Sequence, residues 1–168
     1  IVCMDINWCI QGRWLPSADE DLMAQRVLAC QKPICLAMNT DFDSFLREPI
    51  TADIDQKVDE NIERQPSLVM AERYFQRALF YGMFPGFFSK DGATKAFFEN
   101  PEWYNQVRPL FKKYLPLIQQ LSKAGWEPIT GAETKADRVY LERYGRGEQG
   151  QVFIAARYGD QRWQVSTE

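Results

Sequence analysis

Two short hydrophobic segments that end in polar residues most constrain the fold of this chain. The first reads Ile1-Val-Cys-Met-Asp-Ile-Asn7, and the second reads Pro33-Ile-Cys-Leu-Ala-Met-Asn39-Thr40-Asp41. Hydrophobic strands of this kind, joined by an amphipathic helix, form a βαβ unit of a parallel sheet. In parallel sheets the reactive groups collect at the carboxyl ends of the strands. The sequence therefore predicts an α/β fold with a site where these two strands end.

The helix between the two strands is expected to begin at a capping box, Ser17-Ala-Asp-Glu20, and to end at Lys32-Pro33. The first strand starts at Ile1 without any lead-in segment, so we expect part of the fold to precede it. The apolar stripe of the helix is predicted to consist of Leu22, Met23, Val27 and Cys30.

Two longer helices are predicted after a polar, acidic stretch that runs from Asp41 to Gln65. One helix opens at Pro66-Ser67, and an aromatic segment with glycine and proline follows it at 80–88. The other helix begins at Asn100-Pro101 and runs to about Ala124, because Gly125 is a stop signal. The predicted apolar stripes are Leu68, Ala71, Phe75, Ala78, Leu79 and Gly82 in the first helix, and Leu110, Tyr114, Leu117, Ile118 and Leu121 in the second.

After Trp126 the pattern changes to short alternating segments, which are typical of antiparallel strands. These segments cover 139–144, 151–158 and 162–165, and turns that contain glycine separate them. We therefore expect a helix-and-strand region over 1–130 and an antiparallel sheet over 131–168.

Composition narrows the classes of function that are open to the chain. Its 168 residues carry a formal net charge of −3, which argues against a nucleic-acid partner, because phosphate binding needs a concentrated basic face. No segment approaches the roughly 18 apolar residues of a membrane span, so no membrane partner is expected. The sequence contains no histidine, which excludes catalysis by Ser-His-Asp or Cys-His groups within the chain and leaves carboxylates as the acid/base groups.

The four cysteines point to no cofactor. Cys3, Cys9, Cys30 and Cys35 form no CxxC pair, so no zinc site and no other metal is expected. Cys3 and Cys35 lie in the hydrophobic strands and Cys30 on the predicted buried side of a helix. We therefore predict buried free thiols.

Three parts of the chain carry a resemblance to a known family. They are QKPICLAMNTDF at 31–42, RALFYGMFPGFFS at 77–89, and the stretch 100–128, which contains NPEWYN, RPLFKKY and AGWEP. Together they resemble the last third of a glycoside-hydrolase-like (β/α)8 barrel, in the broad alpha-galactosidase-like group, with the start of its C-terminal β-sandwich. A full barrel takes about 250 residues, so the chain would cover at most half of one.

The resemblance implies a partial TIM-type barrel over 1–130 and the start of a β-sandwich over 131–168. It also implies a carbohydrate substrate, hydrolysis of a glycosidic bond by two carboxylates, and the remainder of the barrel as a partner. Two other functions stay open, namely sugar binding without catalysis and an interaction module in which the aromatic segment docks a partner chain.

Asp5 and Asp41 are the candidate catalytic carboxylates, because each lies near the carboxyl end of a predicted strand. For Asp5, the alternative is a strand-end aspartate that caps neighbouring amides. For Asp41, it is a turn aspartate that bonds its own backbone.

Four more residues are candidate substrate contacts, namely Trp8, Asn39, Asp43 and Phe84. Asp43 follows Asp41 by two residues, and the two carboxylates could bind a polyol together or coordinate calcium. Phe84 lies in the aromatic segment, which together with Trp8 could stack on the apolar face of a sugar ring. The alternative for these aromatic residues is packing between helices and sheet.

Overall fold

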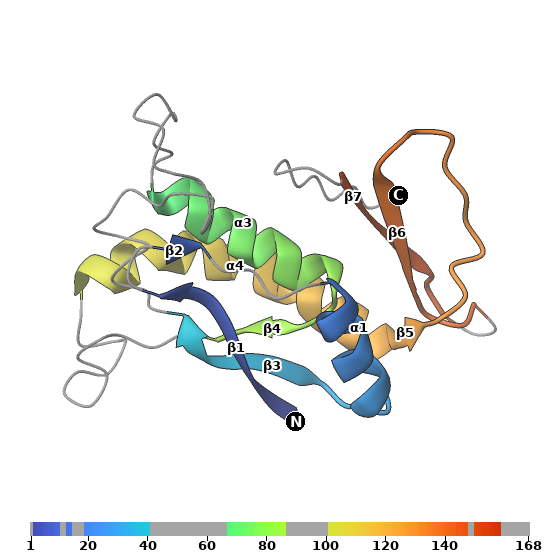
Figure 1. Cartoon of the computed structure of the whole chain (residues 1–168), viewed down its shortest axis with the longest axis horizontal. Helices are drawn as coiled ribbons and strands as arrows, with labels where there is room; N and C mark the ends of the chain where they lie inside the picture. The colour runs from blue at the N-terminus through green and yellow to red at the C-terminus, as the bar shows by residue number, and fades with distance from the viewer. Residues whose placement is uncertain are drawn as a thin grey trace.

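A computed structural model describes residues 2–10, 13–14, 19–40, 67–86, 101–147 and 150–158 of the chain (Figure 1). The long acidic stretch at 41–65 and the end of the aromatic segment, from residue 87 on, lie outside these ranges.

A four-stranded sheet contains the predicted βαβ unit. Its strands are β1 (Val2–Ile10), β2 (Arg13–Trp14), β3 (Ile34–Thr40) and β4 (Phe84–Pro85), in the order β2-β1-β3-β4. β3 pairs in parallel with β1 on one side and with β4 on the other, whereas β2 is antiparallel to β1. The predicted parallel pair is confirmed, and the aromatic segment supplies a short third parallel strand.

Among the described residues, three helices accompany this sheet: α1 (Asp19–Leu28), α3 (Ser67–Phe80) and α4 (Pro101–Ala124). The second and third helices begin where the sequence predicted. α4 runs without interruption through Pro109 and Pro116. It ends as expected, because Gly125 takes a φ of 83° and its N–H donates to the Leu121 carbonyl at 3.0 Å.

One buried cluster joins all three helices to the same face of β3. Ile34 and Leu36, at alternate positions of the strand, are buried together with Leu22 of α1, Phe75 of α3 and Ile118 of α4. Cys35 lies between the two buried strand residues and is only half-buried. The parallel strands β1, β3 and β4 therefore follow one another in chain order, and the described helices pack on one face of the sheet.

A second sheet follows α4 and is antiparallel, as predicted. It consists of β5 (Trp126–Glu127), β6 (Val139–Tyr144) and β7 (Phe153–Tyr158), in the order β5-β6-β7. β6 has the predicted bounds, and β7 begins two residues later than the predicted 151–158. β5 was not predicted, and the strand expected at 162–165 lies outside the described residues.

The second sheet shares its core with the helices. Tyr144 of β6 and Ala155 of β7 belong to the same buried cluster as the helix residues, and Phe153 packs against it. Within the described ranges the four-stranded sheet is open, and β5 pairs with β6 rather than extending that sheet. The fold is therefore mixed α/β, and the partial barrel over 1–130 and the sandwich from 131 stay predictions.

Tyr74 of α3 fixes the end of β4. Its side chain is fully buried, its hydroxyl accepts a hydrogen bond from the Gly86 N–H at 2.9 Å, and the same hydroxyl donates to the Gly86 carbonyl at 2.5 Å. A helix side chain thus holds the backbone directly after the third parallel strand.

We predict that Tyr74→Phe lowers the free energy of unfolding by about 1–3 kcal/mol, because polar backbone groups of Gly86 lose their partner in a largely buried place. Urea denaturation measures the change. Tyr140→Phe is the matched control, since Tyr140 is 51% exposed and its loss of a hydroxyl should cost less than about 0.5 kcal/mol. Equal effects of the two substitutions would contradict the assignment.

Candidate functional site

The carboxyl ends of β1 and β3 lie side by side, and β1 is irregular there. The backbone register pairs Asp5 with Ala37 and Ile6 with Met38, and then shifts so that Cys9 pairs with Thr40. β1 thus carries one extra residue after Ile6, in the Asn7-Trp8 segment. Bulges of this kind are frequent beside functional sites, because they redirect a side chain and end the regular pairing.

This register places three of the predicted site residues near one edge of the sheet. Asp5 and Trp8 belong to β1, and Asn39 belongs to β3, two positions after the partner of Asp5. The structure describes these three residues through their backbone positions. Asp41 follows the last residue of β3 directly, and it lies outside the described residues together with Asp43.

Phe84 lies away from this edge. Its backbone pairs with Cys35, four positions before Asn39 along β3, which corresponds to about 13 Å of strand. Its side chain is half-buried and packs against the hydrophobic cluster. The geometry therefore favours the packing alternative for Phe84.

Sequence reasoning missed a buried charged residue, Arg26, on the inner face of α1. The guanidinium is 5% exposed and forms an ion pair with Glu142 of β6 at 2.9 Å. It also donates to the Tyr144 hydroxyl at 3.1 Å and lies 4.2 Å from the centre of the Trp126 ring. An arginine on α1 thus contacts β5 and β6 of the second sheet.

The partners of Arg26 also form hydrogen bonds of their own. The Trp126 indole N–H donates to the same Glu142 oxygen at 2.7 Å, and the Tyr144 hydroxyl donates to the Phe80 carbonyl at 2.7 Å. Tyr144 packs so closely on Gly82 that a Cβ atom there would lie 2.7 Å from its ring. We call Arg26, Trp126, Glu142 and Tyr144 the arginine junction.

The structure corrects three expectations for α1. The helix ends at Leu28 rather than at Lys32-Pro33, because the backbone turns at Cys30, which has a φ of 49°. Cys30, predicted to be buried on the helix, therefore lies past its end and is exposed. Within the helix Leu22 and Arg26 are buried, whereas Val27 is 58% exposed, because Arg26 takes the inward position and is compensated by groups from the second sheet.

Burial raises the pKa of two tyrosines, Tyr144 of the arginine junction and Tyr81, whose ring lies 5.3 Å from the Arg26 guanidinium. It raises the pKa of Tyr81 to about 12 and also raises the pKa of Tyr144, mainly because a phenolate would lose its hydration there. Both hydroxyls therefore stay protonated at neutral pH. Because Glu142 compensates the charge of Arg26, the arginine junction can join two parts of the fold.

Two further buried arginines line the same core. Arg77 of α3 is 4% exposed and Arg157 of β7 is 7% exposed. The Arg157 guanidinium lies 4.5 Å from the centre of the Tyr140 ring and 5.2 Å from that of Phe80. Burial lowers the pKa of both arginines, that of Arg157 to about 10. The Arg77 guanidinium lies 5.9 Å from the centre of the Tyr81 ring, so both arginines contact aromatic rings.

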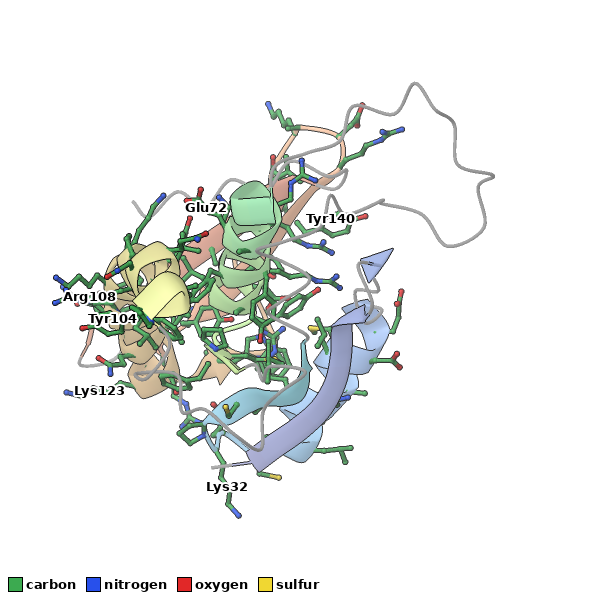
Figure 2. All side chains as sticks on the ribbon, turned by 90° about the vertical axis from the view of Figure 1, so that its left-hand side faces the viewer. Lys32, Glu72, Tyr104, Arg108, Lys123 and Tyr140 are labelled. Atoms are coloured by element: carbon green, nitrogen blue, oxygen red, sulfur yellow. The ribbon has the colours of Figure 1, made fainter. Side chains whose placement is uncertain are left out.

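A hydrogen-bonded carboxylate links α3 to α4. Glu72 on α3 faces α4 (Figure 2), where it accepts hydrogen bonds from Lys113 Nζ at 2.6 Å and from the Tyr114 hydroxyl at 2.7 Å. The bond from Lys113, then that from Tyr114, lowers the pKa of Glu72 below its ordinary value of 4.5. The carboxylate form is thus favoured by the fold.

The described residues contain no group of three or more His, Cys, Asp or Glu side chains that could hold a metal ion. Among these same residues, no helix has the length and the apolar character that a membrane crossing requires. Cys30 is an exposed thiol, Cys35 is half-buried, and the side chains of Cys3 and Cys9 lie outside the described part. A search of protein-family models, of curated proteins and of solved structures finds no match to this chain.

We predict that Arg26→Met lowers the free energy of unfolding by about 3–5 kcal/mol, because it leaves the Glu142 carboxylate buried without its counter-charge. Chemical denaturation measures this change. The matched control is Arg146→Met, which breaks an ion pair with Glu127 at 3.1 Å in which Arg146 is 76% exposed. The control should cost less than about 1 kcal/mol.

A second substitution tests the reason for the Arg26 effect. Adding Glu142→Gln to Arg26→Met should recover part of the lost stability, because no isolated buried charge remains. A double variant as unstable as the sum of the two single variants would show that the two side chains act independently.

For Glu72, the fold lowers the pKa, so its stabilising contribution is present above about pH 4.5 and is lost as the pH falls through the folded-state value. The stability advantage of the unsubstituted chain over Glu72→Gln should therefore shrink between about pH 6 and about pH 3. Carbon-detected NMR titration of the Glu72 carboxyl gives the pKa directly. Lys113→Met should raise it, whereas Lys112→Met, an exposed neighbour, should leave it unchanged.

Proposed function

We propose that this chain forms part of the wall of a (β/α) barrel and contributes to a carbohydrate-hydrolysing site at the carboxyl edge of its strands. The observation that supports the barrel is the chain-order arrangement of β1, β3 and β4 with the described helices on one face. In doubly wound sheets the strand order reverses and helices cover both faces. In a (β/α) barrel the strands follow chain order and all helices lie outside.

The barrel arrangement gives the two faces of β3 different roles. Ile34 and Leu36 are buried on the face that packs against the helices. Cys35, between them, belongs to the opposite face, which would be the barrel interior. Residues at alternate positions of a strand share a face of the sheet, and Asp5 pairs with Ala37. Asp5, Ala37 and Asn39 therefore belong to the same face as Cys35. Because active sites of such barrels lie at the carboxyl ends of the strands, Asp5 and Asn39 are well placed to line one.

Within this proposal Asp5 and Asp41 are the carboxylates of the reaction, one as acid and the other as base or nucleophile. The chain has no histidine that could replace them. Trp8, Asn39 and Asp43 are the substrate contacts, and the irregular pairing of β1 at Trp8 supports a place for it in the site. Phe84 is assigned to packing. The remaining strands of the barrel would supply the rest of the site.

The test is hydrolysis of a panel of aryl glycosides by the protein that carries these 168 residues. Asp5→Asn and Asp41→Asn should each lower kcat by about 10²–10⁴-fold with little change in KM, because each removes a proton-transfer or nucleophilic group and keeps its size. Asp21→Asn, an exposed aspartate of α1, is the matched control and should leave kcat unchanged.

Two outcomes would contradict the assignment. Full activity of both strand-end variants would exclude these carboxylates from catalysis. Glycoside binding without turnover by the unsubstituted protein, weakened by Asn39→Ala, would replace the hydrolase with a sugar-binding function at the same edge.

A further inference from the structure

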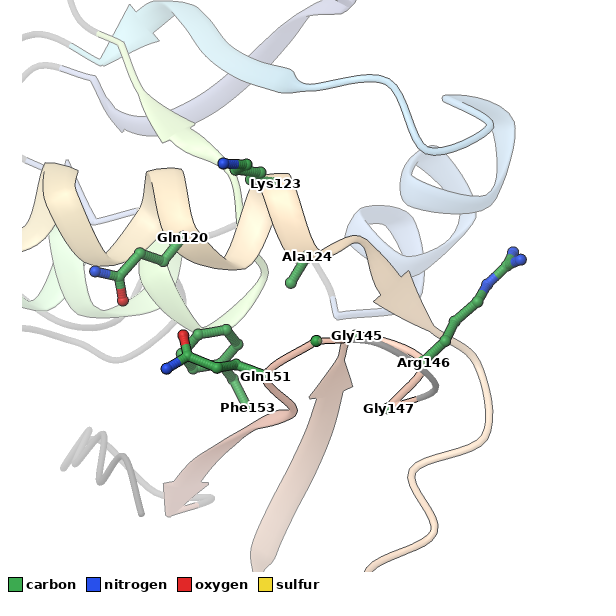
Figure 3. A pocket seen from close by; sticks show the side chains of 9 residues that line it. Gln120, Lys123, Ala124, Gly145, Arg146, Gly147, Gln151 and Phe153 are labelled. Atoms are coloured by element: carbon green, nitrogen blue, oxygen red, sulfur yellow. The ribbon is translucent and has the colours of Figure 1, made fainter.

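A pocket of about 590 Å³ lies at the end of the molecule away from the strand carboxyl edge. It is bounded by the last turn of α4 and by the turn between β6 and β7 (Figure 3). The arrowheads of β1 and β3 point toward one end of the molecule, and the end of α4 lies near the other, beside β5 (Figure 1). The pocket is therefore separate from the proposed hydrolytic site.

Uncharged polar groups and one aromatic ring converge in this pocket. Figure 3 shows the side chains of Gln120 and Gln151 reaching toward the same space beside Phe153. Two cations, Lys123 and Arg146, also line the pocket. Both side chains extend away from the two glutamines (Figure 3), and the Arg146 Nε lies 3.1 Å from a carboxylate oxygen of Glu127. The polar groups beside Phe153 are thus the two amides.

The Phe153 side chain is partly buried and packs against the hydrophobic cluster, to which Leu79 and Leu121 belong. The part of the ring that lines the pocket is available to stack on a ligand.

Glycine shapes the wall of the pocket. Gly145 has a φ of 93°, and a Cβ atom there would lie 2.4 Å from the Gln151 carbonyl oxygen, so this turn requires glycine. Gly150, in contrast, is exposed and has nothing within 4 Å of the place of a Cβ atom.

We propose that this pocket binds a neutral pyranose sugar. A primary amide both donates and accepts hydrogen bonds, which matches sugar hydroxyls, and the Phe153 ring can contact the apolar CH face of the sugar. The volume lies within the range of small-molecule sites. The carbonyl end of α4 disfavours an anion, Glu127 engages Arg146, and the Lys123 side chain extends away from the two amides. The proposal does not depend on the hydrolytic site.

The experiment is a ¹H–¹⁵N NMR titration of the chain with D-glucose, D-galactose and sorbitol. Sorbitol offers the same hydroxyl chemistry without a pyranose face. We expect saturable shifts of the Gly145, Gly147 and Gly150 amides and of the Gln120 and Gln151 side-chain amides with at least one pyranose, and binding of sorbitol at least about tenfold weaker. No saturable shift with either pyranose, or equal binding of sorbitol, would overturn the proposal.

Matched variants locate the binding. Gln120→Ala and Gln151→Ala, both at exposed positions that line the pocket, should each weaken binding about fivefold through the loss of hydrogen bonds. Gln119→Ala, an exposed glutamine beside Gln120 that does not line the pocket, should have no effect. Unchanged affinity in both pocket variants would place the sugar elsewhere and overturn the proposal, whereas sensitivity to Asp5→Asn would assign it to the strand edge.

Discussion

The burial of one positive charge decides how the two sheets meet. Arg26 points into the core from α1, and such a charge is tolerated only where an opposite charge and hydrogen-bond acceptors surround it. Glu142 and Tyr144 supply them from β6, and Trp126 covers the guanidinium from β5. Since these groups lie on both strands at the start of the second sheet, a shifted or rotated sheet would leave the charge uncompensated. The ion pair thus selects one packing geometry in addition to any stability it contributes.

Local signals in the sequence predict most of the helices and strands, but they do not predict which residues of α1 are buried. The bounds of α4 follow from Pro101 and Gly125, and those of β6 from its alternation. The partners of Arg26, in contrast, lie up to 118 positions further along the chain. A pattern of apolar residues assigns an arginine to solvent and Val27 to the core, and both assignments are wrong here. Long-range charge compensation allows an arginine to take the inward position, one helical turn after Leu22.

The two candidate sites also differ in how well the sequence predicts them. The strand edge was predictable, because strand ends collect polar residues, and the parallel register of β1 and β3 brings Asp5, Trp8 and Asn39 near one another in the backbone. The position of Phe84 depended on where the short strand β4 pairs along β3, which composition does not indicate. The pocket near Gly145 was not predictable either, since glycines there indicate only a turn. Its lining combines α4 with a turn about 25 residues later, and only the packing of the second sheet creates it.

The arginine junction and the pocket are physically linked. Gly145 follows Tyr144 directly, and its N–H donates to the Gly125 carbonyl at 2.8 Å, so the wall of the pocket begins where the arginine junction ends. The carboxyl ends of β1 and β3 lie toward the opposite end of the molecule (Figure 1), and α4, a helix of 24 residues and about 36 Å, spans much of the distance to the pocket. Loosening the arginine junction should therefore disturb the pocket before it disturbs the carboxyl ends of the strands. The buried ion pair between Arg26 and Glu142 would thus stabilise the pocket. The strand edge would depend instead on the parallel sheet and on Tyr74.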